Sequence, residues 1–133
     1  KDYQQLLGIR RMVADLGLPV TIEAGRTVRE ADGLALSSRN AYLSAEQRAI
    51  APRLYATLQG VAADVAAGAG ASARAQAAED ALRAAGFDKV DYVGVRDAET
   101  LDPWPGPARP GRVLAAAWLG RTRLIDNLAV PVA

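Results

Sequence analysis

Residues 113–128, with the sequence VLAAAWLGRTRLIDNL, predict a β-hairpin. Residues 113–119 are a nearly continuous apolar run, residues 120–121 (Gly-Arg) form a two-residue turn, and residues 122–128 return as the partner strand. Residues 90–96 contain β-branched and aromatic side chains and predict a further strand. The end of the chain is therefore expected to be a sheet of about three antiparallel strands.

Two helices are predicted before this sheet. Ser44 and Gln47 can form a capping box that opens the first helix. Its apolar stripe follows helical spacing through Ile50, Leu54, Leu58, Val61 and Val65. Pro52 lies inside this stripe, so we expect a kink or two abutting helices there. Ser72 is expected to cap the second helix, and Gly86 to end it.

The first residues predict a helix followed by a strand. Asp2 and Gln5 can form a capping box for a helix over residues 2–16, and residues 20–22 (VTI) favour a short strand. Helix-strand units are typical of α/β architecture, but one unit cannot close a sheet. We therefore expect the last unit of a sheet whose earlier strands are missing.

The polar stretch over residues 25–41 differs in composition from both flanks, with a short strand expected near residues 27–29. We place a domain boundary within it. Residues 1–31 are then the end of an amino-terminal domain, and residues 32–133 form a small α+β domain of two helices and about three antiparallel strands.

Composition excludes several kinds of chemistry. The 133 residues include no His and no Cys, which removes Ser-His-Asp triads, His-ligated metals, disulfides and thiol catalysis. The net charge of +1 argues against nucleic-acid binding. No apolar run approaches a membrane span, and the first residues do not form a signal peptide, so we expect a cytoplasmic protein. The remaining side chains suit phosphate binding better than acid-base catalysis.

Residues 32–40, DGLALSSRN, are the best candidate for such a site. Ser37, Ser38 and Arg39 supply hydroxyls and a planar guanidinium, and Gly33 lets the backbone bend ahead of them. A triphosphate is recognised by groups of this kind. The alternative is an ordinary polar turn in which Arg39 pairs with a nearby carboxylate.

The start of the first helix is a second candidate. Lys1 and Asp2 lie where a helix N-terminus attracts anions, although a solvated terminus capped by Asp2 explains them as well. Gln5 could donate to a small polar substrate or serve only the capping box.

Several other polar or aromatic positions receive no functional assignment. Residues 96–99 predict a solvated turn, and residues 102–111 a Pro-rich loop. The neighbours Asp126 and Asn127 are ambiguous late in the last strand, and Trp104 and Trp118 are expected to pack.

Four stretches resemble the pantoate–β-alanine ligase (pantothenate synthetase) family across essentially the whole chain. The combination of DGLALSSRN with KDxQQ is very specific. The matching stretches are KDYQQL at 1–6, RRMVADLGLPV at 10–20, READGLALSSRN at 29–40 and AWLGRTRLIDN at 117–127.

The resemblance implies a Rossmann-type ligase that works in two steps. Pantoate and ATP, accompanied by Mg²⁺, would give pantoyl adenylate and pyrophosphate, after which β-alanine would displace AMP; ATP and Mg²⁺ would be held mainly by the half of the family protein that is missing here. It implies catalytic roles for Lys1, Ser37, Ser38 and Arg39. It implies nucleotide contacts for Lys1, Asp2, Val28, Leu36, Ser37, Ser38 and Arg39. It implies a pantoate contact for Gln5.

The chain also departs from the family pattern. Members usually carry Pro where this chain has Gly25-Arg26. The family's amino-terminal half, with its His-x-Gly-His motif, most substrate contacts and the contacts of a homodimer, is missing. We therefore expect a carboxy-terminal portion that contributes an ATP lid and is inactive alone. The alternatives are an interaction or regulatory module that reuses the lid, and, less favoured, a nucleic-acid binder.

Overall fold

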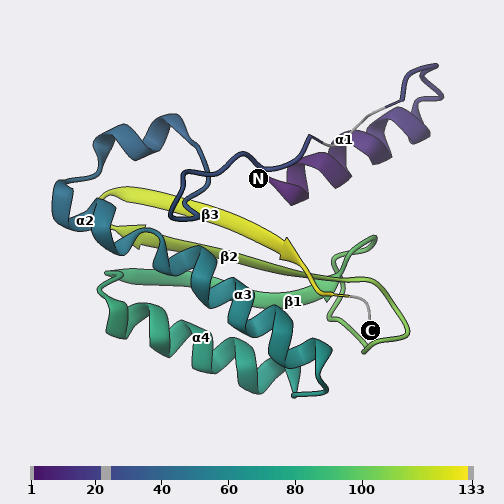
Figure 1. The fold of residues 1–133 in the computed structure, drawn as a ribbon. Helices are drawn as coiled ribbons and strands as arrows, with labels where there is room; N and C mark the ends of the chain where they lie inside the picture. The colour runs from purple at the N-terminus through teal and green to yellow at the C-terminus, as the bar shows by residue number, and fades with distance from the viewer. Residues whose placement is uncertain (1, 22–24, 132–133) are drawn as a thin grey trace.

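The computed structural model describes residues 2–21 and 25–131 and contains helices that precede a single sheet (Figure 1). The helical elements are α1 (Tyr3–Asp15), the 3₁₀ helix η1 (Ser38–Tyr42), α2 (Ala45–Ile50), α3 (Arg53–Ala66) and α4 (Ala71–Ala85). The strands are β1 (Lys89–Asp97), β2 (Gly111–Leu119) and β3 (Thr122–Ala129). The α+β class is confirmed.

The sheet is antiparallel with the order β1-β2-β3. Leu119 faces Thr122 across the tight turn, in which Gly120 has a φ of +58°. Glycine suits this position because its missing Cβ removes the clash that a positive φ imposes on other residues. The hairpin expected from the sequence is thus confirmed, and β1 joins the free edge of β2.

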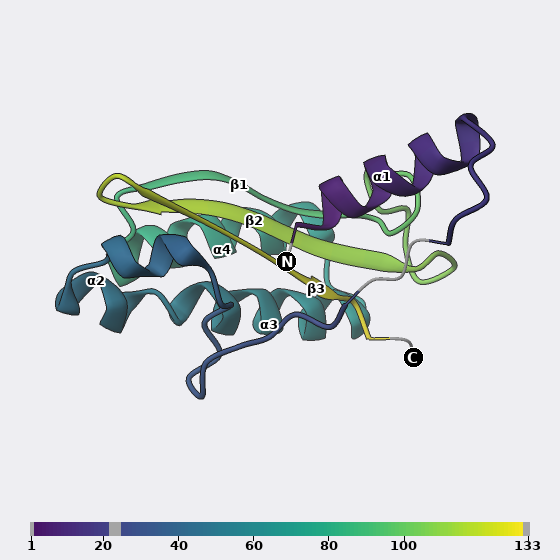
Figure 2. The ribbon, with the colours of Figure 1, turned by 90° about the horizontal axis from the view of Figure 1, so that it is seen from above.

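Helices α3 and α4 cover one face of the sheet (Figures 1 and 2). The apolar stripe of α3 meets alternate residues of the strands, such as Val113 and Leu119 on β2. Both side chains are fully buried, as are Leu54 and Leu58 of α3 and Leu82 of α4. The core therefore lies between this helix pair and the sheet.

Most of the helix boundaries follow the local signals. The capping box of Ser44 and Gln47 is present, and Pro52 separates α2 from α3, so the expectation of abutting helices is confirmed. Gly86 ends α4 in the left-handed conformation. The prediction that Ser72 caps α4 is wrong. Helix α4 starts at Ala71, and the Gly70 carbonyl accepts the first backbone hydrogen bond, from Arg74 at 3.0 Å.

Helix α1 extends away from this compact body (Figure 2). Only half of the expected capping box is present: the Asp2 side chain accepts a hydrogen bond from the Gln5 amide at 3.0 Å, without the reciprocal bond to the Gln5 side chain among the described residues, and the helix buries no residue. Its first turn contacts the remainder through the Tyr3 hydroxyl, which donates to the Ala98 carbonyl, and through the Tyr3 ring, which lies under Arg112. The apolar side chains at helical spacing along α1 are therefore poorly covered: Ile9 and Leu16 are exposed, and Leu6 and Val13 are half-buried.

The strands expected near the start of the chain are not formed in the described residues. Val20 and Thr21 pair with no strand, and Ile22 lies outside the described residues. Around residues 27–29 the structure has only an isolated bridge between Arg29 and Ala35. Among the described helices, none is long and apolar enough to cross a membrane.

Candidate functional site

Residues 28–36 fold back on themselves as a narrow turn. The Leu36 amide donates to the Val28 carbonyl at 2.9 Å, and the Glu30 amide donates to the Leu34 carbonyl at 2.8 Å. Gly33 closes the turn with a φ of +95°, and a Cβ built at this position would lie 2.5 Å from the Tyr55 ring. This turn brings Val28 beside Leu36, and both side chains are exposed.

The Ser37–Arg39 segment leaves this turn as the start of η1. The Ser37 hydroxyl accepts a hydrogen bond from the Arg39 amide at 3.2 Å. Asn40 holds the segment from behind, because its Nδ2 donates to the Ala35 carbonyl at 3.0 Å. The Asn40 Oδ1 is buried and has no hydrogen-bond partner among the described residues. Ser38 and Arg39 are left exposed on the outer side of the turn.

The guanidinium of Arg39 makes a single long hydrogen bond, 3.4 Å to the Arg123 carbonyl on β3. Within the part of the chain that the structure describes, no carboxylate forms an ion pair with Arg39, contrary to the alternative that the sequence allowed. A cation in this setting retains most of its capacity to bind an anion.

Arg39 opens onto a groove of about 820 Å³ between η1, the start of α2 and the β2–β3 turn. Three arginines and no acidic side chain are among the described residues that line it. They are Arg39, Tyr42, Gln47, Trp118, Leu119, Gly120, Arg121, Thr122 and Arg123. Clefts lined by one sign of charge concentrate ligands of the opposite sign.

Arg123 also connects this groove to the start of α1. On the sheet face opposite α3 and α4, Asp2 and Tyr3 line a hollow of about 70 Å³ together with Tyr92 and Arg123. The Arg123 Nε donates to Asp91 at 2.8 Å, which lowers the pKa of that carboxyl below its ordinary value. The structure thus brings Asp2 and Arg39 to two hollows that share Arg123. Gln5 is exposed and is not among the residues lining this hollow, and Lys1 lies outside the described residues.

The sequence reasoning missed a buried ion pair that attaches the turn to the sheet. Arg29 donates to both carboxylate oxygens of Asp126, at 2.6 and 2.9 Å. Strand alternation could have drawn attention to Asp126, since it shares a face with the buried Leu124 and the partly buried Leu128. A carboxylate on an apolar face requires a partner, although the strand pattern does not say which one.

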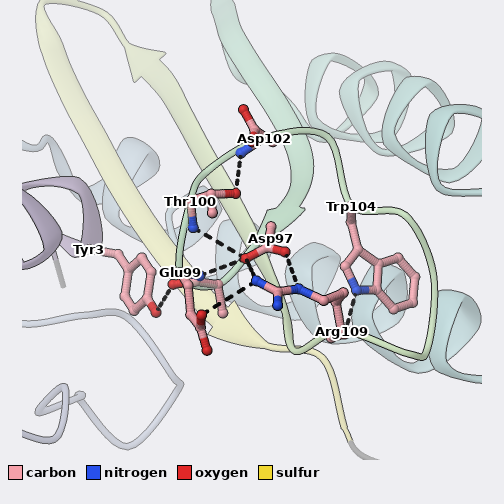
Figure 3. A network of polar contacts seen from close by, with 8 residues as sticks. Tyr3, Asp97, Glu99, Thr100, Asp102, Trp104 and Arg109 are labelled. Atoms are coloured by element: carbon pink, nitrogen blue, oxygen red, sulfur yellow. Dashed lines mark hydrogen bonds and ion pairs between the residues drawn. The ribbon is translucent and has the colours of Figure 1, made fainter.

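The turn over residues 96–99 is not the solvated turn expected from the sequence, because Asp97 is buried (Figure 3). Its carboxylate accepts hydrogen bonds from the Glu99 and Thr100 amides and from Arg109, whose Nε lies 2.8 Å away. The Arg109 guanidinium and these amides hold the pKa of Asp97 well below its ordinary value. All of these donors lie within residues 99–109, so the cluster closes the loop on itself.

Both tryptophans have hydrogen-bond partners. Trp104 packs against the core and donates to the Arg109 carbonyl at 2.8 Å (Figure 3). Trp118 is half-buried outside the core, donates to Asp91 at 3.0 Å and lines the groove that Arg39 faces. No group of three or more acidic, His or Cys side chains that could hold a metal exists within residues 2–21 and 25–131.

Comparison with known proteins places this α+β chain in the ligase class. The sequence model of the pantoate–β-alanine ligase family matches residues 1–129, and the chain belongs to that family. It is 57% identical over 130 residues to the pantothenate synthetase of Paramagnetospirillum magneticum, covering 98% of this chain and 46% of that protein. The Mesorhizobium japonicum pantothenate synthetase is 55% identical, with 100% of this chain and 47% of that protein covered.

Solved structures agree with this assignment. The crystal structure of pantothenate synthetase from Thermus thermophilus matches with a TM-score of 0.89 and 47% identity, over 98% of this chain and 47% of that one. A ligase from Francisella tularensis, complexed with β,γ-ATP and β-alanine, matches with a TM-score of 0.68 and 26% identity, over 97% of this chain and 41% of that one. The chain spans slightly less than half the length of the relatives that it matches.

Proposed function

We propose that this chain is the carboxy-terminal part of an ATP-dependent ligase that condenses pantoate with β-alanine. Family membership supports the reaction class, and the ATP and β-alanine bound to the Francisella tularensis relative support the substrates. The carboxylate of pantoate attacks the α-phosphorus of ATP and pyrophosphate leaves. The amine of β-alanine then attacks the acyl carbon of the adenylate, AMP leaves, and pantothenate forms.

The exposed guanidinium of Arg39 is the single observation that carries this proposal. It lies in a groove that Arg121 and Arg123 also line; Arg123 is paired with Asp91, so Arg39 and Arg121 are the charges that would attract anionic phosphates. Ser37 and Ser38 stand beside Arg39 as hydroxyl donors. Stabilisation of charge that develops on transferring phosphates is a large part of catalysis in such reactions. We assign this segment to the phosphates of ATP.

The remaining roles follow from the family resemblance and belong to the same proposal. Lys1, Asp2, Val28 and Leu36 contact the nucleotide, and Gln5 contacts pantoate. The domain that contains the groove acts as a lid over a site completed by residues outside this chain. A homodimer and a cytoplasmic location are further parts of the proposal.

Mg²⁺ is treated separately because the described residues offer no cluster of metal ligands. The polar side chains that line the groove are guanidinium, hydroxyl, amide and indole groups, which fit phosphate oxygens and not a divalent cation. No step of the proposed reaction is therefore assigned to a metal held by these residues.

The test uses a chimera in which this chain replaces the matching portion of the Paramagnetospirillum magneticum relative. We expect Arg39→Ala to lower pantoate-dependent release of pyrophosphate from ATP by roughly 100-fold or more, the scale for losing one preorganised charge-stabilising donor. Arg74→Ala on α4, which removes an exposed arginine that pairs with Asp64, is the matched control and should leave the rate unchanged. A near-normal rate for Arg39→Ala would refute the assignment.

The 133-residue chain is itself expected to be inactive. It lacks more than half the length of its relatives, and proximity of both reactants requires a complete site. ATP-dependent formation of pantothenate by the purified chain would contradict this part of the proposal.

A further inference from the structure

We propose that Arg29 and Asp126 are positioning residues that set the orientation of the Ser37–Arg39 segment, an inference that rests on the phosphate role proposed above. The two residues are 97 positions apart in the sequence and form a bidentate pair. The side chains are 16% and 3% exposed, so water competes little for either charge.

The guanidinium of Arg29 is held by hydrogen bonds along its edges and by an aromatic ring against its face. Besides Asp126, it donates to the Gly33 carbonyl at 3.1 Å and to the Asn127 carbonyl at 3.4 Å. Its carbon lies 3.8 Å from the centre of the Tyr55 ring on α3. A planar fork held on its edges and stacked on a ring has little freedom to rotate. The turn is thus attached to both β3 and α3.

Asp126 is fixed as firmly as its partner. One of its carboxylate oxygens also accepts a hydrogen bond from the Asn127 amide at 2.8 Å. The carboxylate therefore points to one place above the sheet, and the arginine must meet it there. A buried pair with this geometry defines a position more strictly than an exposed pair can.

The position of Arg29 is transmitted to the phosphate-binding segment through the backbone. Arg29 is paired with Ala35 in an antiparallel bridge, and the next hydrogen bond of this turn joins Leu36 to Val28. Ala35 in turn accepts the hydrogen bond from Asn40 Nδ2 that holds the far side of the segment. The Ser37–Arg39 segment is therefore held at both ends by contacts that depend on Arg29: the Leu36–Val28 hydrogen bond before it and the Asn40–Ala35 hydrogen bond after it.

Strand β3 provides a second reference point. The guanidinium of Arg39 donates to the Arg123 carbonyl, three positions before Asp126 on the same strand. Three residues of a strand span roughly 10 Å. The segment is thus attached to one strand at two points, firmly through the buried Arg29–Asp126 pair and weakly through the long hydrogen bond of Arg39.

A second ion pair on the same turn supplies an internal control. Arg48 of α2 donates to Asp32 at 2.7 and 3.2 Å, but these side chains are 34% and 44% exposed. Exposed pairs constrain geometry weakly. If the turn only needed to be tethered, this pair and the buried pair would matter equally.

The experiment compares variants in the same chimera. Arg29→Lys keeps the charge but removes the fork, and we expect the KM for ATP in pyrophosphate release to rise about tenfold or more, since small misplacements of a reacting group are costly. Arg48→Ala should change it by less than about twofold. Equal effects of these two variants, or no effect of Arg29→Lys, would overturn the proposal.

A double variant separates positioning from stability. Arg29→Met with Asp126→Leu removes both buried charges, and such replacements commonly keep a protein as stable as before. We expect its melting temperature to stay near that of the parent while the KM for ATP remains raised. A double variant with normal stability and a normal KM would show that the pair serves folding only.

An activity-independent measurement completes the test in the 133-residue chain. Arg29→Lys should speed amide hydrogen exchange at Glu30, Gly33 and Leu36 by roughly tenfold or more, with no change at the amides of β2. Uniformly unchanged exchange would count against the proposal. The two proposals fail differently: a normal rate for Arg39→Ala refutes the phosphate role, whereas an impaired Arg39→Ala beside a normal Arg29→Lys refutes positioning alone.

Discussion

Two loops of this molecule are held by a buried aspartate paired with an arginine, yet among the described residues only one of them carries an arginine with no carboxylate partner, Arg39. In the loop over residues 97–110, Asp97 is paired with Arg109, which lies 12 positions away in the same loop. In the loop over residues 28–40, Arg29 is paired with Asp126, which is 97 positions away on β3. The first pair closes a loop on itself, and the second attaches a loop to the sheet.

The difference lies in where the remaining charge stands. Arg109 is engaged by both Asp97 and Glu99, so its charge is neutralised within its own loop (Figure 3). The charge of Arg29 is likewise neutralised by Asp126, but its loop carries a second arginine, Arg39, which faces the groove. A buried ion pair therefore does not by itself indicate a ligand-binding site. The indication is a nearby charge that has no partner and whose loop is held in place by such a pair.

Loss of the buried carboxylate on β3 is expected to have the largest effect. Asp126→Ala should lower the free energy of unfolding by about 3–5 kcal/mol, because it leaves a mostly buried Arg29 without its counter-charge. Asp97→Ala should cost less, since Arg109 is 43% exposed and can be hydrated. Urea unfolding of both variants measures the difference, and an equal or reversed order would break the comparison.

Substitution of a glycine is also expected to cost more stability in the loop over residues 28–40 than in the loop over residues 97–110. Gly33→Ala should destabilise by about 2 kcal/mol or more, because a Cβ would both strain a backbone with a φ of +95° and meet the Tyr55 ring. Gly106 also has a positive φ, +132°, but no atom lies within 4 Å of a Cβ built there. Gly106→Ala should therefore cost only the backbone strain, about 1 kcal/mol. Thermal unfolding that ranks Gly106→Ala as the more damaging change would contradict this account.

Acid should reduce the stability that the Asp97 carboxylate gives to the loop over residues 97–110, and the substitution Asp97→Asn should remove this pH dependence. The folded-state pKa of Asp97 lies below its unfolded value of about 3.9, so its contribution to stability is present above about pH 4–5 and is lost as the pH falls further. Asp97→Asn should be less stable than the parent at neutral pH, and the gap should narrow toward about pH 2. A gap that stays constant in urea unfolding across this range would show that the carboxylate charge is not what holds the loop.

The exposed pair of Arg48 and Asp32 is expected to have the smallest effect. Arg48→Ala should lower the melting temperature by no more than about 2 °C, and added salt should shrink the change, because exposed charges are screened. The Arg48 guanidinium does lower the pKa of Asp32, which shows that the two groups are in contact. Because both are exposed, this contact stabilises the turn only slightly. A loss as large as that of Asp126→Ala would mean that exposure does not separate the two pairs.

The elements that the sequence predicts well are those whose signals are local. Gly120 between two apolar strands specifies the hairpin, and Ser44 with Gln47 specifies the start of α2. The cap of α4 was misplaced because Gly70 lets the helix begin before Ser72, and a glycine cap gives no side-chain signal. The Asp2 cap predicts the start of α1 correctly, but no local signal shows that this helix buries no residue in the chain.

The candidate segment stands out in the sequence, whereas its attachment to the sheet does not. Ser37, Ser38 and Arg39 stand out as neighbours in the sequence, and the structure leaves Arg39 facing a groove. The partnership of Arg29 with Asp126 depends on a fold that joins positions 97 residues apart. The burial of Asp97 was missed for a related reason, since only the path of the following loop brings Arg109 back to it.

The comparison of the two loops is tested most directly by amide hydrogen exchange of the chimera with and without ATP. Ligand contacts slow exchange where they order the backbone. We predict exchange slowed by roughly tenfold or more across residues 36–40 when ATP is bound, with no change across residues 98–110. Slowing confined to residues 98–110, or no slowing across residues 36–40 at saturating ATP, would contradict the account.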